Sequence, residues 1–110
     1  MEDDLAAWGK VIGLETTGHH SGHPRFVTVG FVAEADGAML VAASGPASAW
    51  ADNLRAEPAC HVSLDGIRRP FVATELHDAA RSAAVRELIL KYGTPAERLG
   101  AGPAFRLRPK

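Results

Sequence analysis

The sequence predicts a mainly antiparallel β fold with helices (α+β), in which six short strands close into a small barrel and one main helix lies near the C-terminal end. Three observations lead to this prediction. Short apolar segments with period-two alternation recur along the chain, and Asp-Gly pairs separate neighbouring segments. Strands and helices do not alternate regularly, which argues against a parallel α/β sheet. The length of 110 residues fits one domain, residues 1–110.

Six segments have the alternation or apolar composition of strands: residues 10–17, 25–33, 38–43, 59–64, 67–76 and 104–109. In the second of these, the alternation places four side chains on one face: Val27, Val29, Phe31 and Ala33. The third is apolar on both faces, which predicts a buried strand. Closing such a sheet into a barrel would also remove its exposed edges.

Two Asp-Gly pairs predict hairpin turns, at Asp36-Gly37 and at Asp65-Gly66. The strand that follows the second turn contains Pro70. Proline has no N–H to donate, so Pro70 favours an edge strand or a bulge.

A short helix is predicted after Ser48, which can cap it. Trp50 and Leu54 share one face at the i, i+4 spacing, and Pro58 lies just beyond the end. Because apolar residues at this spacing usually pack, Trp50 is expected in the core more than at a cofactor, and Asn53 on the same helix is expected to be solvated.

The main helix is expected to begin at an Asp78 cap and to end at Gly93, where a positive φ suits glycine. Two further short helical segments are predicted, at residues 3–9 and from a capping box at residues 94–97. An apolar stripe supports the main helix: Ala84, Val85, Leu88, Ile89 and Tyr92.

Composition and charge narrow the function classes. The formal net charge is −1, so no general field attracts nucleic acid or a membrane surface, and neither is an expected partner. No apolar run approaches the ~20 residues of a membrane helix. Cys60 is the only cysteine, and the acidic first residues are unlike a signal peptide. We therefore expect a cytoplasmic protein without disulfides.

The loop TTGHHSGHPR, residues 16–25, holds three of the five histidines. A zinc site would need four protein ligands, or three and a water. His19, His20 and His23 are the candidates, but adjacent histidines seldom reach one ion in a compact turn, and no second cysteine accompanies them, so no metal is expected. A second interpretation is a solvated loop between two strands, with glycine and proline as turn residues.

The third interpretation of this loop is a site for an anion. Gly18 and Gly22 would let backbone N–H groups turn toward a ligand, and Arg25 offers a permanent guanidinium fork for phosphate or carboxylate. Outside the loop, Ser44 precedes a Gly-Pro pair and is either a loop residue or a donor to a ligand at the barrel mouth. Three hydroxyls would add donors within the loop: Thr16, Thr17 and Ser21.

Four motifs occur in an order and spacing that resemble the deazaflavin (F420)-dependent nitroreductase family, a branch of the flavin-binding split β-barrels. That family typically reads TTGRKSGxPR, then an Ala-Ser segment, then WxxNLxAxP, and near the end FRLxP. The corresponding segments here are residues 16–25, 43–45, 50–58 and 105–109. The family's usual Arg-Lys pair is His19-His20 in this chain.

The resemblance implies a split β-barrel that binds F420, whose phosphate and oligoglutamate tail are anionic, and an oxidoreductase that transfers a hydride to a small electron-poor acceptor such as a quinone, an enone or a nitroaromatic. Binding of FMN or another cofactor without turnover is the alternative. Because related barrels are often dimers, a homodimer is an expectation. The resemblance places nine residues at the cofactor: Thr17, Gly18, His19, His20, Ser21, Arg25, Ser44, Trp50 and Asn53.

Overall fold

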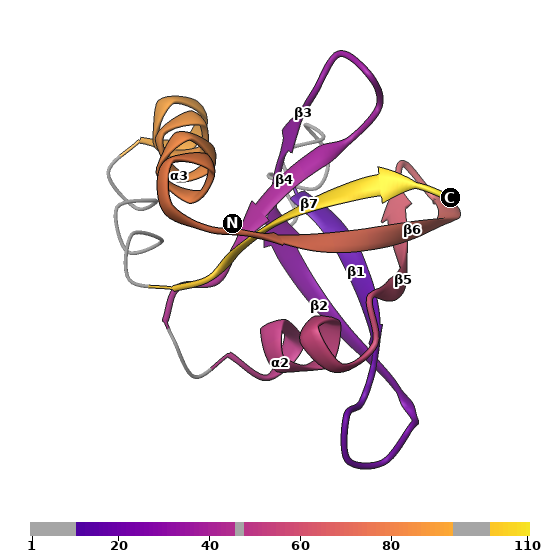
Figure 1. Cartoon of the computed structure of the whole chain (residues 1–110). Coiled ribbons are helices and arrows are strands. Elements are labelled where there is room, and N and C mark those ends of the chain that lie inside the picture. The colour runs from indigo at the N-terminus through magenta and orange to yellow at the C-terminus, as the bar shows by residue number, and fades with distance from the viewer. Residues whose placement is uncertain (1–10, 46–47, 94–101) are drawn as a thin grey trace.

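A computed structural model describes residues 11–45, 48–93 and 102–110 (Figure 1). Over these residues, one antiparallel sheet has the strand order β2-β1-β5-β6-β7-β4-β3 and curls around a core. Its strands are β1 (Val11–Thr17), β2 (Pro24–Gly30), β3 (Val32–Ala33), β4 (Met39–Ala42), β5 (Ala59–Leu64), β6 (Ile67–Leu76) and β7 (Ala104–Pro109). The helices are α2 (Ala49–Ala56) and α3 (Asp78–Tyr92).

This architecture confirms the predicted fold class, with seven strands in the described part of the chain where six were expected. The extra strand arises because residues 25–33 form β2 and β3 rather than one strand. The helical segments predicted at residues 3–9 and 94–97 lie outside the described residues.

The division between β2 and β3 falls at Phe31, which joins the two outermost strands of the sheet. The Phe31 N–H donates to the Tyr92 hydroxyl (2.9 Å), and that hydroxyl donates back to the Phe31 carbonyl (3.0 Å). Lys91 also donates to this carbonyl. Side chains of α3 therefore satisfy the backbone groups of Phe31 where the chain passes from one edge to the other.

This passage corrects one predicted face. Ala33 was expected beside Val27, Val29 and Phe31, but it is exposed, and Val32 packs toward α3 instead. The alternation changes phase at Phe31 because the chain moves there to the opposite edge of the sheet.

The core has two parts, which lie on the two faces of β4. Val41 packs inside the barrel, whereas Leu40 and Ala42 pack between the sheet and α3. The prediction that this strand is buried on both faces is therefore confirmed. The α3 stripe supplies Ala84 and Leu88 to the second part.

Both predicted hairpin turns are confirmed. Gly37 has φ 89°, and the second turn has positive φ at both Asp65 (52°) and Gly66 (78°). The expectation that Pro70 marks an edge strand or bulge is wrong, because β6 lies between β5 and β7. Pro70 is tolerated because it lies one residue beyond the last pair that β6 forms with β7, Phe71 with Pro109.

The helix ends follow the sequence with one correction. Ser48 is the N-cap residue of α2, although its side chain makes no capping bond. The N-cap of α3 is His77 rather than Asp78, because the first N–H groups of the helix, from Ala80 and Arg81, donate to the His77 carbonyl. Gly93 ends α3 with φ 79°, as predicted.

Candidate cofactor site

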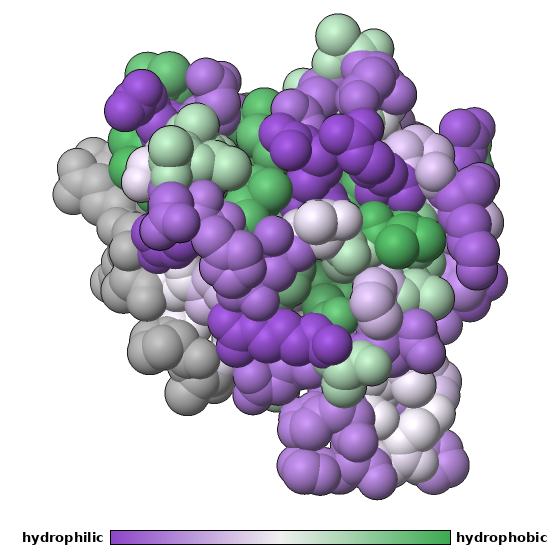
Figure 2. All heavy atoms as spheres, viewed as in Figure 1, coloured by the Kyte–Doolittle hydropathy of each residue, from purple (hydrophilic) through white to green (hydrophobic). Residues whose placement is uncertain are grey.

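A cavity of about 460 Å³ lies between the β1–β2 loop and α2. In Figure 1 the loop extends below the helix, and Figure 2 shows it projecting from the body with polar and weakly polar residues. The volume lies within the range of small-molecule sites, roughly 300–1,000 Å³. The lining residues are Thr16, Gly18, His19, His20, Ser21, Arg25, Phe26, Val27, Ala49, Trp50 and Asn53.

Seven of the nine residues predicted at the cofactor line this cavity: Gly18, His19, His20, Ser21, Arg25, Trp50 and Asn53. Thr17 and Ser44 do not. Side chains alternate along a strand, so Thr17 faces away from the side on which Thr16 is buried. Ser44 is exposed after β4, in a turn whose Gly45 lies close to Gly102.

Four lining residues were not among the predicted cofactor contacts: Thr16, Phe26, Val27 and Ala49. The alternation that buries Leu14 and Thr16 and turns Val27 inward could have identified two of them. No sequence pattern marks Phe26, which remains 75% exposed at the cavity wall, or Ala49 at the start of α2.

Asn53 connects α2 to the loop. Its side-chain oxygen accepts the backbone N–H of His19 (3.0 Å) and lies next to Nδ1 of the same residue (2.5 Å). Its amide nitrogen donates to Thr16 Oγ1 (3.0 Å). Asn53 is 4% exposed and Thr16 is 2% exposed, so the expectation that Asn53 is a solvated helix residue is wrong. Burial requires these bonds, because an unpaired amide would be costly there.

The backbone of the loop forms its own hydrogen bonds. The Gly18 N–H donates to the His23 carbonyl, and the Gly22 N–H donates to the Gly18 carbonyl (both 2.8 Å). The N–H groups of Gly18 and Gly22 themselves are therefore used within the loop. Glycine is needed at position 18 for space, because a Cβ there would lie 2.8 Å from Ser21 Oγ.

Arg25 is the permanent charge of the cavity. It is exposed, and it forms no ion pair with any residue in the described part of the chain. The rings of His19 and His20 lie on the same cavity, 3.9 Å apart between centroids. By contrast, four other arginines are paired with carboxylates: Arg55, Arg68, Arg106 and Arg108. The set at the cavity suits an anionic ligand.

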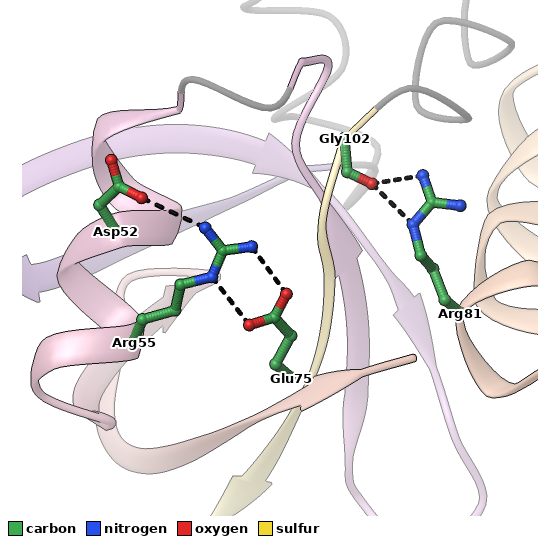
Figure 3. A network of polar contacts seen from close by, with 5 residues as sticks. All are labelled: Asp52, Arg55, Glu75, Arg81 and Gly102. Atoms are coloured by element: carbon green, nitrogen blue, oxygen red, sulfur yellow. Dashed lines mark hydrogen bonds and ion pairs between the residues drawn. The ribbon is translucent and has the colours of Figure 1, made fainter. Parts of the chain in front are cut away.

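Two contacts fix α2 against the barrel. On its outer side, Arg55 donates to both carboxylate oxygens of Glu75 on β6 (2.8 Å each), and Asp52 lies 3.3 Å from the same guanidinium (Figure 3). The bond from Arg55 lowers the pKa of Glu75 below its usual value. On the inner side, the Trp50 ring lies 5.8 Å from the Phe105 ring. Trp50 therefore packs on the core and also lines the cavity.

Figure 3 also shows a contact between α3 and Gly102, which lies just before β7. Arg81 on α3 donates to the Gly102 carbonyl (2.9 Å). Gly102 has no space for a side chain, because a Cβ there would lie 2.1 Å from the Ala43 carbonyl oxygen. This close contact fixes the exposed turn that carries Ser44.

The residues that the structure describes contain no group of three or more His, Cys, Asp or Glu side chains that could hold a metal ion. In the same residues, no helix is long and apolar enough to cross a membrane.

Solved structures with this architecture define the class of small split-barrel proteins. One is an F420-H2-dependent reductase, with 25% identity, coverage of 90% of this chain and 94% of that chain, and a TM-score of 0.74. A second, solved as a domain-swapped dimer, has 24% identity, coverage of 90% and 80%, and a TM-score of 0.74. HutZ, a heme storage protein from Vibrio cholerae, has 16% identity, coverage of 99% and 87%, and a TM-score of 0.76. The last two show the fold alone.

A comparison with family models assigns the chain to one family within this class. The model of the F420H2-dependent quinone reductase family matches residues 5–97, which is most of the chain. The chain belongs to this family. The resemblance to F420-dependent enzymes, the F420 cofactor and the reduction of quinone-like acceptors are thereby confirmed at the level of the family. No curated protein matches the chain.

Proposed function

We propose that this protein is an F420-dependent oxidoreductase that reduces quinone-type acceptors, and that the cavity beside α2 binds the anionic part of the cofactor. The observation that carries the proposal is Arg25, a guanidinium on the cavity wall without an ion-pair partner in the described part of the chain. Among the described residues, no carboxylate lines the cavity to compete for it. The F420H2-dependent family to which the chain belongs has a cofactor with phosphate and carboxylate groups, which match this charge.

The proposal gives each lining residue a role. Arg25 binds a phosphate or carboxylate through its planar fork. His19, His20 and the Ser21 hydroxyl assist as donors, and Trp50 supplies an apolar wall. Two predicted residues, Thr17 and Ser44, do not line the cavity, so the proposal places the anionic group with the other seven predicted residues.

Reduced F420, when bound, supplies the hydride, and the protein contributes binding, orientation and exclusion of water. The buried Asn53–Thr16 pair keeps the loop against α2, and therefore keeps the anion-binding side chains in fixed positions. None of the cavity side chains must donate a proton, because water can supply it.

A homodimer and a cytoplasmic location are further parts of the proposal. A related chain solved as a domain-swapped dimer supports the first. A single buried cysteine, Cys60, is compatible with the reducing cytoplasm.

The first test is a fluorescence titration of F420 with the purified protein at pH 7, with FMN in parallel. We expect saturable binding of F420, weakened about 10- to 100-fold in Arg25→Ala because a charge-assisted contact is lost. Arg69→Ala is the matched control. Arg69 is also exposed and outside the ion pairs found, but it lines a different cavity, beside Leu64 and Met39.

Turnover is then measured as oxidation of F420H2 in the presence of a quinone. Binding of F420 without any oxidation by quinone, enone or nitroaromatic acceptors would favour the alternative of a binding module. Binding of FMN alone would reject F420 as the cofactor. Equal affinity of Arg25→Ala and wild type for F420 would place the anionic group elsewhere.

A further inference from the structure

The contact between Asn53 and His19 determines which ring nitrogen of His19 carries a proton. A backbone N–H is always a donor, and the Asn53 side-chain atom 3.0 Å from the His19 N–H must therefore be the oxygen. The other bond agrees, because the Asn53 nitrogen then donates to Thr16 Oγ1. The His19 N–H thus fixes the orientation of this amide, and the Thr16 hydroxyl, which can accept as well as donate, is compatible with it.

The same oxygen lies against Nδ1 of the His19 ring. A carbonyl oxygen can only accept, so Nδ1 must carry the hydrogen in this contact. In a neutral imidazole the other nitrogen, Nε2, is then unprotonated and carries a lone pair. No residue in the described part of the chain forms a hydrogen bond with Nε2.

An unprotonated Nε2 is a poor partner for an anion, because its lone pair faces the negative oxygen. Protonation reverses this relation. The imidazolium keeps its Nδ1–H on Asn53 and gains an Nε2–H, which can donate to phosphate or carboxylate. The Asn53 oxygen accepts from the ring in both charge states, so protonation needs no rearrangement of the buried amide.

The neighbours of His19 at the cavity are basic or neutral in the described part of the chain. On the loop, the His20 ring lies 3.9 Å away between centroids, and β2 contributes Arg25 to the same cavity. On α2, the carboxylate of Asp52 is paired with Arg55. β1 contributes the neutral Thr16, and no carboxylate from residues 11–45, 48–93 or 102–110 lines the cavity. An anion at this site therefore meets basic and neutral groups among the described residues.

From this arrangement we infer that His19 binds the anionic group of the cofactor through Nε2 in its protonated form, so that cofactor binding takes up a proton. Asn53 is the positioning residue, because its oxygen keeps the hydrogen on Nδ1 and leaves Nε2 to the ligand. This inference rests on the proposed function. It goes beyond that function because it names the atom, the charge state and the residue that sets them. Unlike a permanently charged residue, His19 would bind the anion only when it is protonated.

The first experiment measures the tautomer of the ligand-free protein. Long-range ¹H–¹⁵N correlation spectra of the histidine side chains, recorded at pH 8, report which nitrogen is protonated. We expect His19 to be the Nδ1–H tautomer. Finding the Nε2–H tautomer for His19 would overturn the inference without bearing on whether F420 binds.

The second experiment titrates F420 at pH 8 and at pH 6. We expect affinity to rise about tenfold as the pH falls, because the protonated ring adds a charge-assisted hydrogen bond to the anion. His19→Gln should lose most of this gain. The matched control, His23→Gln, should keep it, because His23 belongs to the same loop but does not line the cavity. A gain in His19→Gln equal to that of wild type would overturn the inference.

Asn53 is tested with two substitutions. Asn53→Asp keeps an acceptor for both N–H groups of His19, and we expect the Nδ1–H tautomer to persist, with the gain in F420 affinity shifted to higher pH by the added carboxylate. Asn53→Leu removes the acceptor. In this variant we expect no preference for the Nδ1–H tautomer of His19 and no rise in F420 affinity from pH 8 to pH 6. If Asn53→Leu does not fold, the Asn53→Asp result alone decides, and an unchanged pH profile contradicts the inference.

A failure of the proposed function can be told apart from a failure of this inference. If F420 does not bind at any pH, the proposed function fails, and inorganic phosphate becomes the probe. Phosphate should then shift the Nε2 resonance of His19 and raise the pH at which it titrates. If phosphate also leaves His19 unchanged, the inference is overturned as well. If F420 binds, and its affinity rises between pH 8 and pH 6 by the same factor with and without His19, the proposed function stands and the inference is overturned.

Discussion

Side chains from the two helices hold the backbone at two places, at Phe31 just after β2 and in the loop just after β1, but the two sets of hydrogen bonds differ in what they leave available. At Phe31, the Tyr92 hydroxyl accepts from the backbone N–H and donates to the carbonyl, so its bonding capacity goes into the fold. Burial raises the pKa of Tyr92, as expected for a hydroxyl removed from water.

At the loop end, Asn53 also binds backbone, but one of its bonds goes to the ring of His19. That ring has a second nitrogen, which is left for a ligand. The comparison shows what separates a binding region from a structural one. A binding region keeps a hydrogen-bonding group, here the second ring nitrogen of His19, that the fold itself does not use. The following predictions test this distinction, beginning with the largest expected effect.

Tyr92→Phe should destabilise the protein by about 1–3 kcal/mol, because it leaves the Phe31 N–H without its acceptor. Affinity for F420 should not change, because Tyr92 does not line the cavity. Denaturant unfolding followed by tryptophan fluorescence, together with the F420 titration, measures both quantities. A large loss of F420 affinity in the folded variant would remove the contrast between the contacts at Phe31 and those at His19.

Thr16→Val should cost about 1–2 kcal/mol, because a side chain of nearly equal size removes the acceptor of the buried Asn53 amide nitrogen. Unlike Tyr92→Phe, it should also weaken F420 binding several-fold, since Asn53 is then held on one side only. The same two measurements apply. Unchanged affinity would show that the orientation of Asn53 does not depend on Thr16.

Glu75→Gln should have the smallest effect, about 0.5 kcal/mol at pH 7, because the Arg55–Glu75 pair is partly exposed to solvent. Arg55 lowers the pKa of Glu75 below 4.5. The contribution of the pair is therefore fully present above pH 4.5 and is lost as the pH falls through the lowered pKa. Unfolding free energies of both proteins between pH 7 and 3 should converge at the acidic end, and a constant difference would contradict this assignment.

Local rules predicted most of the fold. The Asp-Gly turns, the start of α2 and the Gly93 end of α3 depend on backbone preferences of a few neighbouring residues, and the structure agrees with them. The break at Phe31 could not be predicted in this way. In the sequence, period-two alternation continues from Val27 to Ala33. The break depends on Tyr92, which lies 61 residues beyond Phe31 along the chain.

The candidate site shows the same limit. Composition indicated which residue types gather around an anion, and most of those residues line one cavity. The sequence could not show that Gly18 and Gly22 use their N–H groups within the loop, since that depends on how the turn closes. Nor could it show that Asn53 is buried, because its partners lie 34 and 37 residues away.

The single-residue link at Phe31 has a consequence for strand register. β2 pairs with β1 from Val11–Gly30 to Thr17–Pro24, whereas β3 pairs with β4 at the opposite edge of the sheet. One residue cannot absorb a change in length, so a slip of β2 along β1 must also displace β3 along β4. Such a slip would turn two sets of side chains to the wrong face at once. The link therefore couples the register of the β1–β2 pair to that of the β3–β4 pair. A residue inserted at positions 30–32 would disturb both edges of the sheet.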